Sequence, residues 1–195
     1  MQNEFEIKFL NVNEEELREK LLSLDAKIKQ ERKLMRRQTL DFPSGVVPEG
    51  ERKWARVRDE GNKITMTIKH VIDKSKIDGT KEVEAIVDDF DAACNIYVEC
   101  GLSKASYQEN YREEWELEGS SITIDTWPGL KPFVEIESPS KEQAESLSNK
   151  LGFNIEEGLF GSIDLIYEKT LKINPDTINR APELTFDNFE TVLKS

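Results

Sequence analysis

Apolar and polar residues alternate along most of eight segments of the chain, which is the period of a β-strand with one buried face. In the first segment, Phe5, Ile7 and Phe9 share one face, and two glutamates and a lysine share the other. The pattern predicts strands over residues 4–9, 28–42, 52–58, 63–71, 82–87, 106–117, 121–127 and 132–137. In the second strand the apolar residues do not decide the buried face, and Arg36 and Arg37 fall on opposite faces.

Helical periodicity appears at three places between or after these strands. Asn13 suits an N-cap because glutamates fill the turn that follows it and a leucine stripe comes next. Gly101 and Gly152 stand where two other helices would end. The pattern predicts helices over residues 13–25, 89–100 and 141–151.

The chain beyond residue 152 lacks the strand pattern. It is predicted to be partly helical, around residues 162–170 and 187–193, with interruptions at Asn174-Pro175 and Ala181-Pro182. We expect one main domain over residues 1–172 and a C-terminal tail over residues 173–195 that packs on it.

The polar faces of the strands are densely ionic, with Glu-x-Glu at positions 4/6, 82/84 and 135/137 and Arg-x-Arg at 56/58. In a half-exposed sheet these faces would meet water. In an inverted barrel they would line the interior, and about eight strands suffice to close one. Because the ionic residues are concentrated in type, and helices are available to cover an apolar exterior, we expect the second arrangement. The predicted fold is α+β: a closed antiparallel eight-stranded β-barrel, or tunnel, with a charged interior and helices packed outside.

Composition limits the classes of partner. The chain has 39 acidic and 27 basic residues and a formal net charge of −12, whereas an open nucleic-acid-binding face is normally basic. No segment approaches the roughly 20 apolar residues that span a bilayer, and the first residues contain no apolar signal core. We therefore expect a cytoplasmic protein that binds neither nucleic acid nor membrane. The sole histidine, His70, and the spacing of Cys94 and Cys100 argue against histidine- or cysteine-based sites.

A charged interior needs compensation. Crowded carboxylates raise one another's pKa unless cations lie among them. Arg and Lys can supply part of that charge, and a divalent ion the rest. Oxygen-only ligands favour Mg²⁺ or Mn²⁺ over zinc, and such an ion together with Arg and Lys suits a polyphosphate. The expected partner is a small-molecule triphosphate.

The sequence Glu4-Phe-Glu6-Ile-Lys8 resembles the ExExK signature of the CYTH superfamily, the triphosphate tunnel metalloenzymes. The resemblance covers roughly residues 3–151 and looks closest to the class IV adenylate cyclase-like proteins. Further matches follow in the same order along the chain: Arg56-Val-Arg58, Thr67-Ile-Lys69, Glu82 and Glu84, Arg112, Asp125, and Phe133-Val-Glu135-Ile-Glu137.

The resemblance implies roles for particular residues. The implied metal ligands are Glu4, Glu6, Glu84, Asp125, Glu135 and Glu137, and the expected ion is Mg²⁺ or Mn²⁺. The implied triphosphate contacts are Lys8, Arg36, Arg56, Arg58, Lys69 and Arg112. The implied catalytic set is Glu4, Glu6, Lys8, Arg58 and Lys69. In the second strand, Arg36 is preferred for its distance to Asp41-Phe-Pro43, and Arg37 remains an alternative.

Three functions are consistent with this resemblance. The first is a metal-dependent phosphohydrolase of inorganic, thiamine or nucleoside triphosphate. The alternative is a class IV adenylate cyclase that makes cyclic AMP and pyrophosphate from ATP, which needs a purine pocket that no residue of the sequence identifies. The second alternative is a non-catalytic module that binds polyphosphate or nucleotide. Formation of a homodimer is left open.

Overall fold

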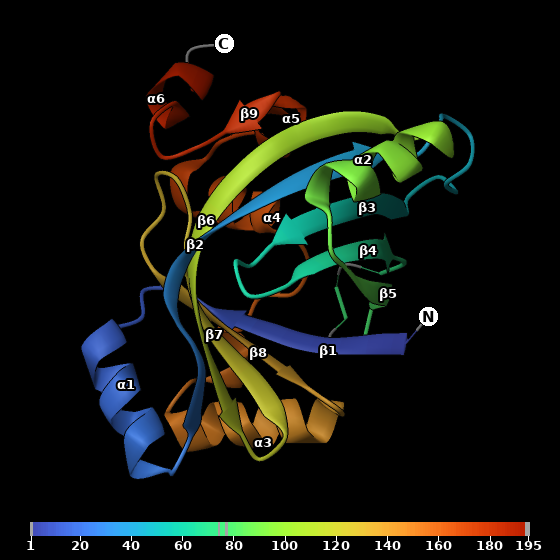
Figure 1. Cartoon of the computed structure of the whole chain (residues 1–195). Coiled ribbons are helices and arrows are strands. Elements are labelled where there is room, and N and C mark those ends of the chain that lie inside the picture. The colour runs from blue at the N-terminus through green and yellow to red at the C-terminus, as the bar shows by residue number, and fades with distance from the viewer. Residues whose placement is uncertain (1, 74, 77, 194–195) are drawn as a thin grey trace.

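The computed structural model describes residues 2–73, 75–76 and 78–193, and for residues 2–4 only the backbone. Strands dominate it and curl around a common interior (Figure 1). The barrel strands are β1 (Gln2–Phe9), β2 (Lys27–Asp41), β3 (Arg52–Asp59), β4 (Ile64–Val71), β5 (Thr80–Val87), β6 (Ser103–Leu117), β7 (Ser120–Thr126) and β8 (Phe133–Ser138). Each corresponds to a predicted strand.

The strands are joined edge to edge in a ring. Their order is β2-β3-β4-β5-β1-β8-β7-β6, and β6 pairs again with β2, all antiparallel. The predicted antiparallel barrel is therefore confirmed. The seam between β1 and β5 is short: it pairs Gln2, Asn3 and Glu4 with Glu82, Lys81 and Thr80. Within the described residues, the rest of β5, residues 83–87, pairs with β4 alone and leaves that edge of the wall open.

Three helices cover the apolar outside of the barrel: α1 (Glu14–Ser23), α2 (Phe90–Glu99) and α3 (Lys141–Leu151) (Figure 1). Asn13 is the predicted N-cap of α1, and Asp89 and Ser140 cap α2 and α3; the side chains of all three accept hydrogen bonds from the first turns. Beneath α1 and α3 lies one core, formed by Ile7, Phe9, Leu17, Leu21, Trp115, Ile122, Ile124, Val134, Ile136, Leu147 and Leu151. Beneath α2 lies another, formed by Leu40, Ala55, Val57, Phe90, Ala93, Cys94, Tyr97 and Leu102. The apolar strand faces point outward, as an inverted barrel requires.

The chain after α3 forms η1 (Ile155–Glu157), α4 (Ile163–Leu171), α5 (Pro175–Arg180), β9 (Glu183–Leu184) and α6 (Phe189–Val192). Three of these elements, η1, α5 and β9, were not predicted. Pro175 begins α5 as its first residue, with Asn174 as N-cap, because proline is tolerated in a first helical turn; the Asn-Pro pair starts a helix here. The two-residue strand β9 adds to β6 in parallel. A third core joins both sides of the expected boundary at residue 172: Trp127, Phe133, Ile166, Tyr167, Ile178, Ala181, Leu184, Phe189 and Val192.

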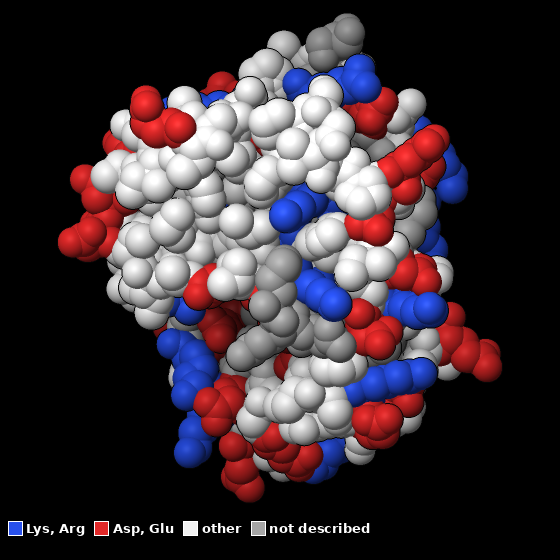
Figure 2. Space-filling model, turned by 90° about the vertical axis from the view of Figure 1, so that its right-hand side faces the viewer, with Lys and Arg blue, Asp and Glu red and all other residues white. Residues whose placement is uncertain are grey.

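Charged side chains of both signs lie on the side of the molecule shown in Figure 2. The side shown in Figure 2 mixes acidic and basic side chains around its lower part, next to a broad area almost free of charged residues. None of the described helices is long and apolar enough to cross a bilayer.

Candidate functional site

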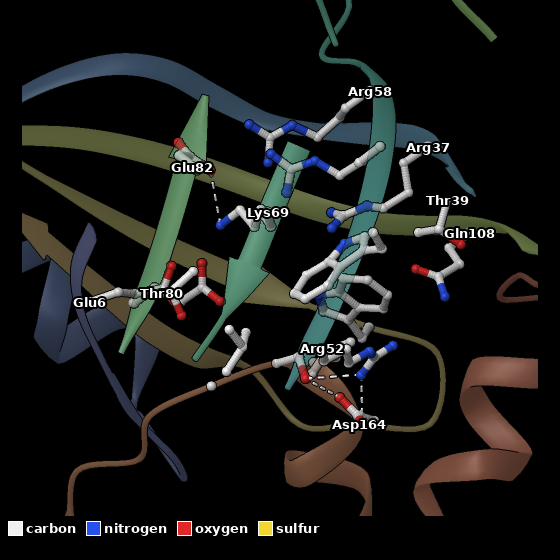
Figure 3. A pocket seen from close by; sticks show the side chains of 18 of the residues that line it. Glu6, Arg37, Thr39, Arg52, Arg58, Lys69, Thr80, Glu82, Gln108 and Asp164 are labelled. Carbon is white, nitrogen blue, oxygen red and sulfur yellow. Dashed lines mark hydrogen bonds and ion pairs between the residues drawn. The ribbon is translucent and has the colours of Figure 1, made fainter. Parts of the chain in front are cut away.

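The interior of the barrel holds a cavity of about 710 Å³ lined mainly by charged side chains. Strands from all sides contribute, and residues of the segment before and within α4 and α5 line one end of it (Figure 3). The basic lining residues are Lys8, Arg37, Arg52, Arg56, Arg58, Lys63, Lys69, Arg112 and Arg180. The acidic ones are Glu6, Asp41, Glu60, Glu82, Glu84, Glu114, Glu135, Glu137, Asp164 and Asp176.

Arginines form the cationic part of the cavity and are held out of water. Arg37, Arg56 and Arg58 are all at least nine-tenths buried. Burial, and then the charge of Arg58, lower the pKa of Arg56 to about 10, although Glu82 and Glu84 act against them. Burial, followed by Arg56, Arg58 and Arg112, holds the pKa of Arg37 well below its usual range. These guanidinium groups therefore repel one another, and an anion between them would relieve that repulsion.

Two of these arginines also carry unused hydrogen-bond donors. The Nε atoms of Arg37 and Arg56 are buried, and neither finds an acceptor in the part of the chain that the structure describes. A buried donor without an acceptor costs about 1–3 kcal/mol. Both residues line the cavity, but their Nε atoms are themselves shielded from it.

Three of the carboxylates, Glu6, Glu135 and Glu137, lie on the wall made by β1 and β8. Their register sets Glu6 opposite Glu137 and Lys8 opposite Glu135. Like charges directly opposite one another on a sheet face are destabilising, and here Lys8 forms ion pairs with Glu6 and, at 3.6 Å, with Glu135. Burial alone would raise the pKa of Glu135, but Lys8 and then Arg112 outweigh burial and lower it to about 2.

The carboxylate oxygens of this wall are suitable ligands for a hard cation, but they are not arranged as a metal site. No three acidic, histidine or cysteine side chains of the described residues converge into a metal-binding group. The reason is visible in the ion pairs: Lys8 holds Glu6, and Arg112 Nη2 lies 2.7 Å from Glu135. A divalent ion would have to displace Lys8 from Glu6.

Replacing Glu135 by Gln is expected to make stability less sensitive to acid. The folded-state pKa of about 2 lies below the ordinary value of 4.5, so the unfolded chain takes up the proton first. The ionised carboxylate thus contributes stability above about pH 4.5 that is lost as the pH falls toward 2. Urea unfolding of both proteins across this pH range checks the point, and an equally steep loss of stability in the variant would contradict it.

Arg36, the preferred second-strand contact, does not reach the cavity. Its side chain is half exposed, its Nε lies 3.1 Å from Asp59 Oδ2, and its guanidinium lies over Phe90. The neighbouring Arg37 is buried and lines the cavity (Figure 3). The preference for Arg36 is therefore corrected, and Arg37 takes its place.

The structure places the other predicted site residues with two further differences. Lys8, Arg56, Arg58, Lys69 and Arg112 line the cavity, as do Glu6, Glu84, Glu135 and Glu137. Asp125 is fully buried and does not line the cavity, so the structure does not bring it together with the other expected metal ligands. Glu4 lies on β1, but its side chain is outside the described residues.

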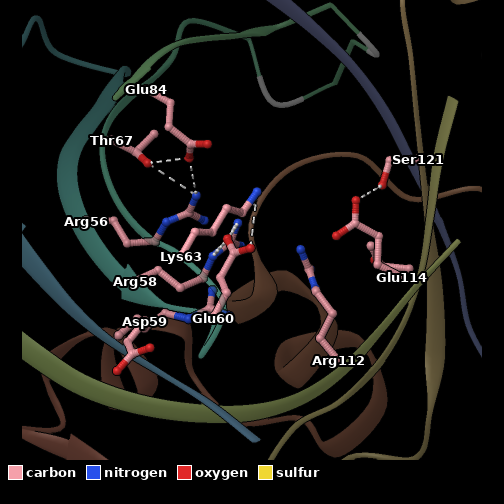
Figure 4. Close-up of polar contacts among 12 residues, drawn as sticks. Arg56, Arg58, Asp59, Glu60, Lys63, Thr67, Glu84, Arg112, Glu114 and Ser121 are labelled. Atoms are coloured by element: carbon pink, nitrogen blue, oxygen red, sulfur yellow. Dashed lines mark hydrogen bonds and ion pairs between the residues drawn. The ribbon is translucent and has the colours of Figure 1, made fainter. Parts of the chain in front are cut away.

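Several lining residues were not predicted, and some of them come from a turn and from the helices after residue 152. Glu60, in the β3–β4 turn, is almost fully buried; its carboxylate accepts a hydrogen bond from Arg58 at 2.7 Å and lies 3.3 Å from Lys63 (Figure 4). At the other end, Arg52 donates to Asp164 at 3.0 Å and to Asn179 at 2.7 Å (Figure 3). The alternation of apolar and polar residues along strands does not predict that a glutamate in the turn after Arg-x-Arg is buried.

Two indole rings line the same cavity. Trp127 is almost fully buried beneath Arg37, whose guanidinium lies 4.4 Å from the centre of its ring. Trp54 is partly exposed and lies under Arg52, at 4.9 Å. The cavity therefore offers aromatic as well as charged surface.

Comparison with known proteins places this geometry in a family. The model of the CYTH domain matches residues 2–159, most of the chain and the whole barrel. The chain belongs to the CYTH family. No protein among the curated ones matches its sequence significantly. The family assignment supports the broad interpretation of the cavity as a site for a triphosphate, and it confirms the resemblance inferred from the sequence.

Solved structures share the CYTH fold at low sequence identity. A conserved hypothetical protein of Pyrococcus furiosus is 23% identical, with a TM-score of 0.63 over 80% of this chain and 94% of that one. A protein of Pyrococcus horikoshii is 24% identical, with a TM-score of 0.64 over 85% and 99%. A candidate adenylate cyclase of Vibrio parahaemolyticus is 14% identical, with a TM-score of 0.69 over 86% and 98%. At these identities the likeness concerns the fold.

Proposed function

We propose that this CYTH protein is a divalent-metal-dependent enzyme that hydrolyses a triphosphate inside the barrel. One observation carries the proposal: arginines on β2, β3 and β6 converge on one cavity, and three of them, Arg37, Arg56 and Arg58, are at least nine-tenths buried there. A chain of phosphates presents acceptor oxygens and negative charge along its whole length. Guanidinium groups suit phosphate because they bind it through paired hydrogen bonds.

The two walls would divide the work. Arg37, Arg56, Arg58, Arg112 and Lys69 would neutralise phosphate oxygens, and they hold their positions before the substrate arrives, so that little reorganisation opposes the reaction. Glu6, Glu135 and Glu137 would hold Mg²⁺ or Mn²⁺ on the wall made by β1 and β8. When bound, the ion supplies Lewis acidity and lowers the pKa of a bound water. Lys8 neutralises this wall when no ion is present.

A panel of substrates tests the proposal. Purified protein is incubated with tripolyphosphate, thiamine triphosphate and nucleoside triphosphates, with Mg²⁺, with Mn²⁺ and with a chelator, and the products are identified. Diphosphate plus orthophosphate, formed only with metal, is the expected result. Tight triphosphate binding without any product would indicate the binding module instead, and the absence of both would end the proposal.

Adenylate cyclase activity is the second candidate, and Trp54 is the observation that favours it. Its ring is partly exposed in the cavity and gives aromatic surface on which a purine could stack. The ribose 3′-hydroxyl of ATP would then attack the α-phosphate and release pyrophosphate. Cyclic AMP and pyrophosphate among the products would support this candidate over hydrolysis.

Glu6→Gln and Glu137→Gln are each expected to raise the metal concentration needed for activity by roughly tenfold or more. Even the loss of a residue that hydrogen-bonds to a metal ligand typically weakens metal binding by this factor. Either change removes one of two opposed carboxylates. Glu116→Gln is the matched control, because Glu116 pairs with Lys29 at the surface and does not line the cavity. Titration of activity with Mg²⁺ measures the effect, and equal metal requirements in all three variants would contradict the assignment.

A further inference from the structure

A buried polar network connects two of the cavity arginines, Arg112 and Arg37, and Asp125 is its centre. Each oxygen of this carboxylate accepts two hydrogen bonds. Oδ1 accepts from Arg112 Nε and from Asn110 Nδ2, both at 2.8 Å. Oδ2 accepts from Arg112 Nη2 at 2.7 Å and from Thr123 Oγ1 at 2.8 Å. About four lone-pair sites are available on a carboxylate, so none is left for a metal ion.

The network continues to a second arginine. Asn110, which is also fully buried, accepts a hydrogen bond on Oδ1 from Arg37 Nη2. Its amide orientation is fixed from both sides, because Asp125 requires a donor and Arg37 requires an acceptor. Arg37 is held from below by the ring of Trp127. One carboxylate therefore orients two cavity arginines: Arg112 directly and Arg37 through Asn110.

Binding a metal at Asp125 would dismantle this arrangement. The ion would displace buried donors from both oxygens of this carboxylate, and a buried charged group that loses a partner is strongly destabilising. The register gives the same answer, since Asp125 on β7 is paired directly with Arg112 on β6. Glu6, Glu135 and Glu137, in contrast, open onto the cavity.

We propose that Asp125 and Asn110 are positioning residues that aim Arg112 and Arg37 at the triphosphate, and that Asp125 does not bind the metal. The inference rests on the proposed function, since it takes the cavity as the triphosphate site. Its physical basis is preorganisation: a guanidinium held in place by buried partners loses little freedom when it binds phosphate.

Two binding measurements separate the walls. Tripolyphosphate binding is measured by calorimetry in EDTA, where no metal contributes, and Mn²⁺ binding is measured by electron paramagnetic resonance without tripolyphosphate. Asp125→Asn is expected to weaken tripolyphosphate binding about tenfold or more, the effect of a lost charge-assisted hydrogen bond, and to leave Mn²⁺ binding within about twofold of wild type. Glu137→Gln is expected to do the reverse. Mn²⁺ binding lost equally in both variants would overturn the proposal.

A double-mutant cycle keeps the test decisive if Asp125→Asn does not fold. Asn110→Leu breaks the link between Asp125 and Arg37 but leaves both Arg112 hydrogen bonds to Asp125 in place. It should therefore weaken tripolyphosphate binding in the wild-type background and have little further effect in Arg37→Met. A merely structural Asn110 would give the same loss in both backgrounds and would overturn the proposal. Wild-type protein that binds no tripolyphosphate would instead refute the proposed function itself.

Discussion

Replacing Arg37 by Met is expected to weaken tripolyphosphate binding by roughly 100-fold, the upper range for a hydrogen bond to a charged group, whereas Arg36→Met should change it by less than about twofold. The two residues are neighbours in sequence and identical in chemistry, but Arg37 is buried in the cavity and Arg36 pairs with Asp59 at the surface. Calorimetric titration of both variants measures the difference.

The stability of Arg37→Met separates a binding effect from a folding effect. Burial and three neighbouring arginines disfavour the charge on Arg37 in the empty cavity. Removing that charge is therefore expected to leave the melting temperature unchanged or to raise it, while binding is lost. Such an opposition between stability and function is typical of preorganised sites. A loss of binding in Arg36→Met, or in both variants equally, would show that the inward face of β2 has been assigned wrongly.

The sequence did not show whether Arg36 or Arg37 faces the interior, because the apolar residues near them in β2 do not all fall on one face. Leu34 and Met35 are adjacent, so each face has one apolar residue. In the structure Leu34 points outward yet stays 44% exposed, while the inward Met35 is fully buried. Periodicity identifies the inner face only where a helix covers the outer one, as α1 and α3 do for β1.

Asp125 shows a different limit. The alternation along β7 predicts that Asp125 faces the interior, but the hydrogen-bond partner of such a carboxylate depends on the residue opposite it on the next strand. That residue is Arg112, and the pairing follows from the register of β6 and β7, which the order of residues alone does not reveal. The same holds for Arg52 and Asp164, which are brought together from β3 and α4. The ring of strands was predictable from local alternation, whereas these contacts are long-range.

Ile7→Asp is expected to prevent folding, with a loss of about 4 kcal/mol or more, the range for a buried unpaired charge. Ile7 is fully buried, is paired with Ile136, and fits closely against Gly158, where an added Cβ would come within 2.3 Å of Ile7 Cδ1. Far-ultraviolet circular dichroism and thermal melting measure the loss. Ile7→Val, which removes one methyl group, should cost only about 1 kcal/mol.

The neighbouring position supplies the sharper comparison. Glu6→Gln changes a residue that faces the cavity, so it should alter metal binding and leave the melting temperature close to that of wild type. Substitutions at two adjacent residues of β1 would thus have different effects: Ile7→Asp would prevent folding, and Glu6→Gln would weaken metal binding. In a sheet whose polar face met bulk water, Glu6→Gln would affect neither. A folded Ile7→Asp protein that still bound tripolyphosphate would mean that the apolar face of β1 does not lie beneath the helices.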